Sequence, residues 1–397
     1  MRRETSVIIA AGAVTLALSF GIRSIFGVVL DPISEAYGWD RSVFSLSLAI
    51  QNLVWGAAQP VFGMMADRLG DRKALWVGLG VYLAGMLVTI LGATPLAMHL
   101  GAGALVGAGI AGTSFGLVLS VVGRSTTEAE RSKALGLTSA LGSLGQGVMP
   151  LLAGWTTAAL GWEATLILFA ALLAPMALCI PHLNAKVPLG SAAPAPLVPT
   201  GELLARAFGH TSYVLLTLGV FVCGFHVAFI SAHFPAYVYE TCGSLALGGA
   251  AIGIVGAGNV VGTYITGQLG ARYRKPWILS AIYALRALVI FVFIMIPPSP
   301  VTVVLFSAAM GLLWLSTVPL TAALVATMFG PRYMGTLYGL VFLSHQVGSF
   351  IGVWMGGRVY DLYGSYDLVW WTAIALGLAS AAVHLPIRER AWAPAPA

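Results

Sequence analysis

The sequence predicts an all-helical membrane protein with twelve transmembrane helices arranged as two six-helix bundles. Three observations support this fold class: the composition, the spacing of the apolar runs, and the distribution of positive charge between the runs. Of the 397 residues, 58% are hydrophobic and only 9% are charged, whereas soluble proteins carry about 25% charged residues. So few charges cannot cover a soluble surface, so a lipid bilayer must surround most of the chain.

Twelve apolar runs follow one another along the chain, each close to the roughly 20 residues that a membrane helix needs. The first six lie at residues 6–30, 42–66, 74–93, 96–121, 132–158 and 163–181. The second six lie at 212–238, 245–270, 277–297, 300–328, 334–358 and 368–386. We therefore expect an N-terminal bundle over 1–181, a linker over 182–210 and a C-terminal bundle over 211–397. The Pro/Ala/Ser/Gly-rich stretch 189–201 is typical of a linker outside the bilayer.

The basic residues outside the apolar runs fall almost entirely on one side of this topology. Loops on the side of the N-terminus hold sixteen Lys and Arg residues, and loops on the other side hold two. Because positive residues are enriched in cytoplasmic loops, we expect both termini and the linker in the cytoplasm and the protein in the cell (inner) membrane. This asymmetry accounts for the net charge of +6, so no nucleic-acid partner is expected.

The two halves of the chain show signs of an internal repeat. Segment 63–73 (GMMADRLGDRK) aligns with segment 267–277 (GQLGARYRKPW). When segment 136–155 is placed above 339–358, three glycines coincide in each half: Gly136, Gly145 and Gly154 lie over Gly339, Gly348 and Gly357. Parallel repeats joined by a linker predict two bundles with a substrate site between them near the middle of the bilayer.

The stretch 63-GMMADRLGDRK-73 resembles the G-x-x-x-D-R-x-G-R-[RK] loop signature of the major facilitator superfamily. Asp71 adds an acid to this pattern. The resemblance implies the major facilitator fold, and it implies a cytoplasmic gate that includes Asp67, Arg68 and Arg72. In such a gate, the charged residues pair with neighbouring helix ends and stabilise one conformation.

A second resemblance concerns segment 21–41 (GIRSIFGVVLDPISEAYGWDR), which is similar to the first helix of monocarboxylate transporters. Arg23 falls where that family carries a lysine, so the resemblance implies that Arg23 contacts the substrate. The same family carries an Asp and an Arg four residues apart in helix eight, and the aligned positions here are Asn259 and Thr263. The proton relay of that family therefore cannot be carried over to this chain.

Two arginines, Arg23 and Arg286, lie inside apolar runs, whereas every Asp and Glu maps to a terminus, a loop or a helix end. A charge at the bilayer centre costs about 3 kcal/mol even on insertion scales. Each arginine must therefore reach water, backbone carbonyls or an anion from outside. The functional interpretation is that at least one binds a carboxylate through its guanidinium fork. Otherwise Arg23 extends to the headgroups and Arg286 braces a neighbouring helix.

Further polar residues share helix faces and are candidates for the substrate site. The alternative role for each is a hydrogen bond between helices, which is worth about 0.6 kcal/mol. Two of them, His226 and His345, could also carry a coupled proton, because histidine titrates near neutral pH. In the other route, the bound anion itself carries the proton. The candidates are Asn52, Gln59, His226, Asn259, Tyr338, His345 and Gln346.

The sequence therefore predicts a monomeric secondary active transporter for a small organic anion, with a monocarboxylate as the leading candidate and proton coupling as an open question. It contains no P-loop, H-E-x-x-H or C-x-x-C pattern, so we expect no catalytic residue, metal site or cofactor. The three cysteines are expected to be core residues rather than disulfides. The alternative function is an efflux pump (a proton antiporter) for amphipathic compounds, which usually needs a buried acid.

Overall fold

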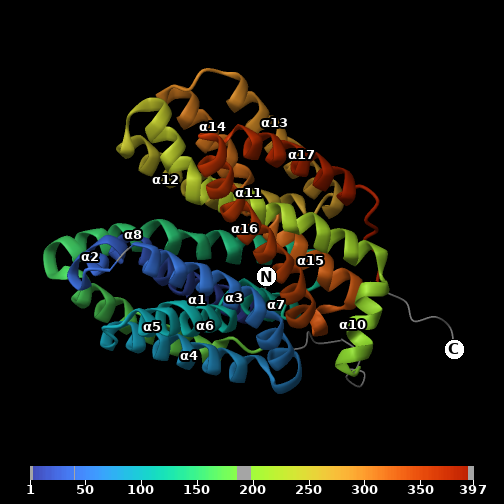
Figure 1. Cartoon of the computed structure of the whole chain (residues 1–397). Coiled ribbons are helices and arrows are strands. Elements are labelled where there is room, and N and C mark those ends of the chain that lie inside the picture. The colour runs from blue at the N-terminus through green and yellow to red at the C-terminus, as the bar shows by residue number, and fades with distance from the viewer. Residues whose placement is uncertain (1–2, 40, 186–197, 392–397) are drawn as a thin grey trace. The chain divides into compact units, whose positions relative to one another are not determined.

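A computed structural model describes residues 3–39, 41–185 and 198–391, and the regular structure in these ranges is entirely helical (Figure 1). The chain folds into two compact units. The first unit comprises Met1–Thr127, Leu137–Leu189 and Arg332–Gly339. The second unit comprises Glu128–Gly136, Gly190–Pro331 and Leu340–Ala397.

Most helices before residue 185 belong to the first unit. They are α1 (Arg3–Ser24), α2 (Phe26–Tyr37), α3 (Arg41–Leu69), α4 (Asp71–Leu91), α5 (Pro95–Met98), the π-helical η1 (His99–Leu105), α6 (Val106–Thr113), α7 (Phe115–Arg124), α8 (Glu128–Ala171), α9 (Ala174–Cys179) and the short 3₁₀ helix η2 (Ile180–His182). Within α8, Gly161 adopts φ +85°, a conformation that glycine tolerates without steric cost. This kink separates the two apolar runs predicted at 132–158 and 163–181.

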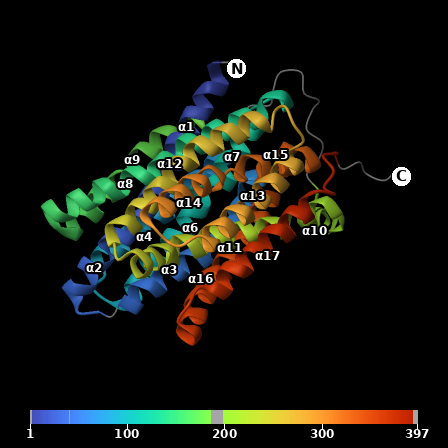
Figure 2. The same ribbon diagram turned by 90° about the horizontal axis from the view of Figure 1, so that it is seen from above.

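The helices after residue 198 belong mainly to the second unit. They are α10 (Thr200–Gly209), α11 (Thr211–Cys242), α12 (Leu245–Leu269), α13 (Lys275–Met295), α14 (Pro300–Leu313), α15 (Val318–Phe329), the 3₁₀ helix η3 (Pro331–Tyr333), α16 (Met334–Tyr363) and α17 (Asp367–His384). Within this unit, α12 packs against α14 and α13 packs against α17 (Figure 2). In the first unit, α6 packs against both α3 and α4.

Ten helical segments of the described chain are long and apolar enough to cross a membrane. One of them, Glu128–His182, contains the kink at Gly161 and so covers two of the predicted runs. The helix α3 has 29 residues but is not among the ten, because Gln51, Asn52 and Gln59 lower its hydropathy. The protein is thus an integral membrane protein with many apolar helices, and the count of twelve stays a prediction.

The internal repeat is visible in the contacts inside each unit. A Cβ atom added to Gly107 would lie 2.6 Å from the carbonyl oxygen of Gln51, and one added to Gly311 would lie 2.7 Å from that of Val255. Both members of the second pair lie 204 residues after their counterparts. The same glycine contact, with the backbones in close approach, therefore recurs in both units at equivalent positions.

Each unit interrupts one helix at nearly the same place in the repeat. In the first unit, α6 and α7 are separated at Ser114, whose backbone is extended. In the second unit, α14 and α15 are separated by residues 314–317. Interrupted helices free backbone N–H and C=O groups that must find partners away from water, and polar side chains gather at both breaks.

The predicted linker, 182–210, is partly helical. Residues 186–197 lie outside the described residues, but Thr200–Gly209 forms the helix α10. Leu203 and Ala207 bury one face of this helix, and Glu202 pairs with Arg206 one turn later. The predicted linker is therefore helical over this part, because apolar residues spaced four apart favour a helix over a flexible chain.

Candidate functional site

Arg23 is the centre of a polar cluster in the first unit. Its Nη2 donates to the Oδ1 of Asn52 at 2.6 Å, and its guanidinium lies 5.1 Å from the ring centroid of Trp55. Asn52 is itself oriented by a 3.0 Å bond from its Nδ2 to the carbonyl of Leu48. Among the described residues, Arg23 is paired with no carboxylate and its buried Nε has no hydrogen-bond partner. The side chain is therefore held in place without a countercharge.

The break at Ser114 is stabilised by the same face of α3. Gln59 donates through Nε2 to the carbonyl of Ala111 at 3.0 Å, and the Ser114 hydroxyl donates to Gln59 Oε1 at 3.1 Å. Trp55 Nε1 lies 3.2 Å from both the Ser114 Oγ and Gln59 Oε1. We call Arg23, Asn52, Trp55, Gln59 and Ser114 the Arg23 cluster.

Ser114 also belongs to a G-x-S-x-G pattern at residues 112–116. In hydrolases that pattern positions a nucleophilic serine on a turn between a strand and a helix. Here it lies between two helices, and Ser114 bonds to the amide of Gln59 and the indole of Trp55 rather than to a histidine. The serine supports the helix break.

Arg286 of α13 lies at the break in the second unit and is completely buried. Its Nε donates to the carbonyl of Leu313 at 3.1 Å, and its Nη2 donates to the same oxygen at 2.6 Å and to the carbonyl of Trp314. The guanidinium also lies 5.3 Å from the ring centroid of Tyr283. Of the two roles considered for Arg286, the contacts therefore match a brace for backbone carbonyls.

Asn259 of α12 binds a backbone N–H group at the same break, whereas Arg286 binds its carbonyl groups. Its Oδ1 accepts from the backbone N–H of Leu315 at 3.0 Å and from the hydroxyl of Thr263 at 3.1 Å. Together, Arg286 and Asn259 satisfy both carbonyl and N–H groups that the interrupted helix frees. Neither interaction involves a carboxylate.

The two histidines considered for proton coupling have different surroundings. His226 is completely buried, its Nε2 lies 2.8 Å from the carbonyl of Ala373, and its Nδ1 has no partner among the described residues. Nε2 must therefore carry the proton and donate to that carbonyl. The Nδ1 of His345 lies 3.1 Å from Gln346 Oε1 and 3.4 Å from the Ser349 hydroxyl. His345 thus belongs to a small network on α16.

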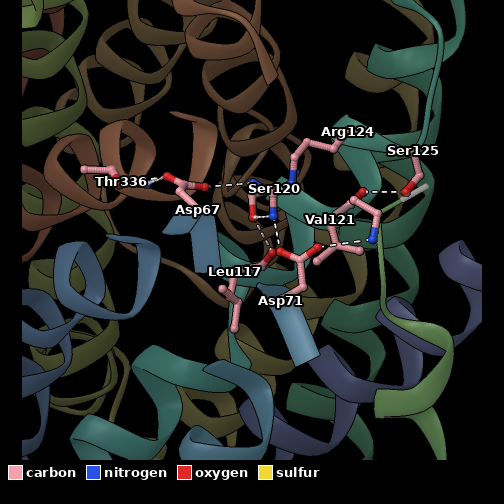
Figure 3. A network of polar contacts seen from close by, with 9 residues as sticks. Asp67, Asp71, Leu117, Ser120, Val121, Arg124, Ser125 and Thr336 are labelled. Atoms are coloured by element: carbon pink, nitrogen blue, oxygen red, sulfur yellow. Dashed lines mark hydrogen bonds and ion pairs between the residues drawn. The ribbon is translucent and has the colours of Figure 1, made fainter. Parts of the chain in front are cut away.

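A third set of polar contacts surrounds Asp67 at the end of α3 (Figure 3). Asp67 Oδ1 accepts from Arg124 Nη1 at 2.8 Å, and Asp67 Oδ2 accepts from both the backbone N–H and the hydroxyl of Thr336 at 2.7 Å. Arg124 Nη2 also pairs with Asp71 and contacts the Ser120 hydroxyl at 3.1 Å. We call Asp67, Asp71, Ser120, Arg124 and Thr336 the Asp67 network.

The Asp67 network is nearly buried, with side-chain exposures of 3% for Asp67, 6% for Asp71 and 14% for Arg124. Burial raises the pKa of Asp67, and the positive charge of Arg124 together with the Thr336 hydrogen bonds opposes that rise. Because Thr336 lies in the first turn of α16, the Asp67 carboxylate also caps the N-terminus of this helix.

Several predicted residues come together, and others do not. Arg23, Asn52 and Gln59 share one cluster, and Arg286 and Asn259 share another. Of the predicted gate residues, Asp67 is central, whereas Arg72 is exposed and donates to the carbonyl of Pro181 at 2.5 Å, and Arg68 is exposed. Tyr338 is buried within the part of α16 that belongs to the first unit.

Sequence reasoning missed Arg124 and Thr336. Arg124 was counted as a topology charge, although an arginine at a helix end near two acids is a candidate ion-pair partner. Thr336 could have been suspected from its place at the start of a helix, where threonine can cap or be capped. Cys223 is free, as expected, and lies in a hydrophobic core cluster with Val222, Tyr283 and Ala381.

Two units with similarly placed helix breaks, each supported by buried polar side chains, are typical of helical solute transporters. The sequence profile of the Major Facilitator Superfamily matches residues 12–353 and, again, 216–396. The chain belongs to this superfamily.

Relatives with similar sequences are transporters. The MFS-type transporter YcxA of Bacillus subtilis, described as uncharacterized, is 24% identical over 383 residues, which cover 91% of this chain and 90% of YcxA. Monocarboxylate transporter 11 of Homo sapiens is 25% identical over 391 residues, covering 91% of this chain and 78% of that protein. The vesicular acetylcholine transporter of Mus musculus is 25% identical over 350 residues, covering 85% and 63%.

Solved structures share the fold. The human organic anion transporter MFSD10 (TETRAN) matches with a TM-score of 0.73 at 17% identity, covering 97% of this chain and all of that one (100%). The fucose:proton symporter FucP of E. coli matches with a TM-score of 0.72 at 13% identity, covering 96% and 99%. At these identities, the likeness concerns the fold alone.

Proposed function

We propose that this protein is a secondary active transporter that moves a small organic anion, with a monocarboxylate as the leading candidate, by alternating access of twelve helices. The observation that carries the proposal is Arg23. It is a guanidinium within an apolar helix that has a positioning partner, Asn52, but no carboxylate among the described residues.

The chemistry of Arg23 suits a carboxylate ligand. Asn52 takes one donor of the guanidinium, and the Nε remains without a partner in the described structure. An uncompensated charge away from water is costly, so an anion that pairs with it gains more than it would at a wet surface. The planar fork can bind both carboxylate oxygens, and the Trp55 face limits how the guanidinium can turn.

The relatives support this class of substrate. Monocarboxylate transporters occur among them, at 22–25% identity. The similarity of segment 21–41 to their first helix is a further support, because it puts Arg23 where that family carries a basic residue.

We further propose that the Asp67 network is the cytoplasmic gate and that both termini face the cytoplasm. The charge asymmetry of the loops supports this orientation. The network supports the gate, because one carboxylate joins α3, the end of α7 and the first turn of α16 through charge-assisted bonds. Such bonds are stronger than neutral ones, but they can still break during a conformational cycle.

Uptake of labelled organic acids by proteoliposomes tests the proposal, with pH and voltage imposed separately. Losing a charge-assisted contact costs roughly 1.5–3 kcal/mol, so Arg23→Gln should weaken affinity for the transported acid by about 10- to 150-fold. Arg23→Lys should recover only part of this, because lysine lacks the fork. Arg358→Gln, at an exposed arginine of α16, is the matched control and should transport normally.

The alternative of an efflux pump for amphipathic compounds makes the opposite prediction. The vesicular acetylcholine transporter among the relatives keeps this alternative open. If Arg23→Gln transports organic acids with unchanged affinity, or if only amphipathic compounds are carried, the anion proposal fails and the efflux pump becomes the better explanation.

A further inference from the structure

Two helices begin in one unit and continue in the other. The first residues of α16, Arg332–Gly339, belong to the first unit, and the first residues of α8, Glu128–Gly136, belong to the second. The glycine alignment of the two halves places Gly136 over Gly339, so the two segments are equivalent in the repeat. Each unit therefore holds the start of one helix from the opposite half of the chain.

Both segments are held at a glycine contact with the backbones in close approach. In the first unit, a Cβ atom added to Gly63 of α3 would lie 2.7 Å from the backbone nitrogen of Thr336. In the second unit, one added to Gly267 of α12 would lie 2.6 Å from the Cα atom of Gly136 and 3.0 Å from the carbonyl oxygen of Ser132. Gly63 and Gly267 are themselves equivalent, 204 residues apart. The crossing of α16 with α3 thus has a counterpart in the crossing of α8 with α12.

The ion pair of the first crossing has no counterpart at the equivalent positions of the second. At the offset of 204 residues, Ala271 stands at the position of Asp67, and Met328 stands at that of Arg124. Met328 is 1% exposed. These apolar side chains cannot form the charge-assisted bonds that hold the first crossing. The second crossing is therefore closed by backbone packing without an equivalent of the Asp67 network.

Ser132 lies at the second crossing with a buried hydroxyl group that has no hydrogen-bond partner among the described residues. The residue is 2% exposed. A serine inside a helix can bond to the carbonyl four residues earlier, and Ser143 of the same helix does so, at 2.9 Å from the oxygen of Ser139. The hydroxyl of Ser132 lies instead against Gly270, where an added Cβ atom would be 2.6 Å from the Oγ atom. It is therefore shielded from solvent and unbonded while the crossing is closed.

A second hydroxyl in the same condition lies further along α8. Ser139 is 1% exposed, and its hydroxyl also lacks a partner in the described part of the chain. Ser132, Gly136 and Ser139 are spaced four and three residues apart, so they share one face of the helix. Gly136 places this face against Gly267. Two unsatisfied hydroxyls therefore flank the glycine contact.

An unsatisfied buried hydroxyl raises the free energy of the state in which it is buried. Ser132 lies near the start of α8, beside the exposed Lys133. When the start of α8 moves away from α12, water can reach the hydroxyl and this cost disappears. The hydroxyl thus opposes closure of the second crossing, whereas the Asp67 network favours closure of the first.

We propose that the crossing of α8 with α12 is the second half of the cytoplasmic gate and that Ser132 sets how readily this gate opens. The Asp67 network stabilises the closed gate, and the unsatisfied hydroxyl of Ser132 destabilises it. A ligand can shift a protein between two states only by its difference in affinity for them, so a transporter works best when the two states are similar in free energy. The opposing contributions bring them closer. The inference rests on the gate proposed above, whereas the identity of the substrate does not enter it.

Distances between two spin labels across the second crossing test the proposal without any substrate. The labels are attached at Ala129→Cys on α8 and Arg272→Cys just after α12, both at exposed positions. Pulsed electron paramagnetic resonance of the purified full chain then gives the ratio of open to closed populations. The native cysteines are replaced by alanine at Cys179, Cys223 and Cys242.

Relief of one unsatisfied hydroxyl corresponds to about tenfold in an equilibrium constant. Ser132→Ala should therefore lower the ratio of open to closed populations by about tenfold, because alanine has no hydroxyl to leave unbonded. Asp67→Asn should raise the same ratio, because it weakens the latch of the other half. A ratio that is unchanged or higher in Ser132→Ala would overturn the proposal.

Ser143→Ala is the matched control. Ser143 lies on the same helix and is 5% exposed, but its hydroxyl already has a partner, so its removal should leave the ratio unchanged. Ser139→Ala removes the other unsatisfied hydroxyl and should shift the ratio in the same direction as Ser132→Ala. A shift in Ser143→Ala as large as that in Ser132→Ala would reveal a general effect of removing hydroxyls from α8 and would count against the proposal.

The contact between Ser132 and Gly270 provides an independent variant. Gly270→Ala adds a methyl group 2.6 Å from the Oγ atom of Ser132, and this group also meets the flexible end of the Leu320 side chain, which can turn away. The crossing should then close less fully, and the open population should rise. Adding Ser132→Ala removes the oxygen that the methyl group meets and should bring the population back toward the wild-type value. A double variant as open as Gly270→Ala alone would refute the contact and, with it, the proposal.

The outcomes separate this inference from the proposed function. If the wild-type protein takes up no organic acid, the proposed substrate class is refuted, and the spin-label populations still decide the role of Ser132. If Ser132→Ala lowers the open population while Asp67→Asn does not raise it, the opening role of Ser132 holds and the assignment of the Asp67 network to the same gate fails.

Discussion

The two helix breaks satisfy the same backbone requirement with different side chains. In the first unit, the neutral groups of Gln59 and Trp55 hold the break at Ser114. In the second unit, a buried guanidinium and the amide of Asn259 hold the break at residues 314–317. In the first unit, Arg23 donates to Asn52 rather than to the backbone of the break, whereas Arg286 of the second unit donates to the backbone of the break itself.

This difference distinguishes two roles of an arginine side chain in a membrane helix. A guanidinium that binds the backbone carbonyls of a helix break stabilises the fold. Its removal should therefore lower the stability of the unit. A guanidinium that is positioned by one amide and one aromatic ring keeps donors that can bind a ligand. Its removal should therefore weaken ligand binding. Sequence position alone does not distinguish the two cases.

Substitution of the two arginines by methionine should give the largest contrast. Arg286→Met leaves the carbonyls of Leu313 and Trp314 without donors, and each unsatisfied buried acceptor costs about 1–3 kcal/mol. Relief from burying a charge offsets part of this loss, and we expect a net loss of about 2 kcal/mol or more. Arg23→Met removes one bond to Asn52 and should change stability by about 1 kcal/mol or less.

Thermal unfolding of the purified variants in detergent measures this contrast. Binding of an organic acid by the same samples should show the reverse order, because Arg23→Met loses the proposed carboxylate contact and Arg286→Met, where folded, does not. Equal stability losses in the two variants would remove the distinction between brace and ligand.

The sequence predicted the helical fold because the length of an apolar run is a local property of the chain. Arg23 and Asp67 could be singled out for the same reason: a charge in an apolar run and a loop signature are both visible in one dimension. The helix breaks were not predicted, because the residues around Ser114 and Trp314 resemble those of uninterrupted membrane helices. A break is selected by the side chains that satisfy it, and these come from other helices.

The contacts of the predicted residues could not be predicted from the sequence either. Asp67 contacts Thr336, which is 269 residues later in the chain, and no spacing rule links the two. The repeat could have identified equivalent positions in the two units. The offset of 204 residues between Gly63 and Gly267 also pairs Ser19 with Cys223 and Tyr82 with Arg286.

A smaller effect is expected from the amides that support the two breaks. Asn259→Ala leaves the N–H of Leu315 without its acceptor, which costs about 1–3 kcal/mol. Gln59→Ala should cost less, about 1 kcal/mol, because Trp55 still bonds to the Ser114 hydroxyl. Asn259→Asp is the matched control: it keeps the acceptor oxygen and adds a carboxylate near Arg286, so it should unfold close to the wild-type temperature. A loss in Asn259→Asp as large as in Asn259→Ala would show that the acceptor is not what matters.

An effect on kinetics, rather than on substrate affinity, is expected at the Asp67 network. Asp67→Asn keeps an oxygen that can accept from Thr336 but loses the charge that pairs with Arg124, which still has Asp71. A charge-assisted bond is worth about 1.5 kcal/mol or somewhat more, which corresponds to roughly tenfold in a rate. Loss of this bond should lower the population of the state in which the gate is closed, so anion exchange, which passes through that state, should slow by about tenfold. Equilibrium affinity should stay within a few fold because Arg23 is untouched. Glu202→Gln, at an exposed pair on α10, should leave both quantities unchanged. If Asp67→Asn instead abolishes equilibrium binding while exchange proceeds at the normal rate, Asp67 belongs to the substrate site and not to a gate.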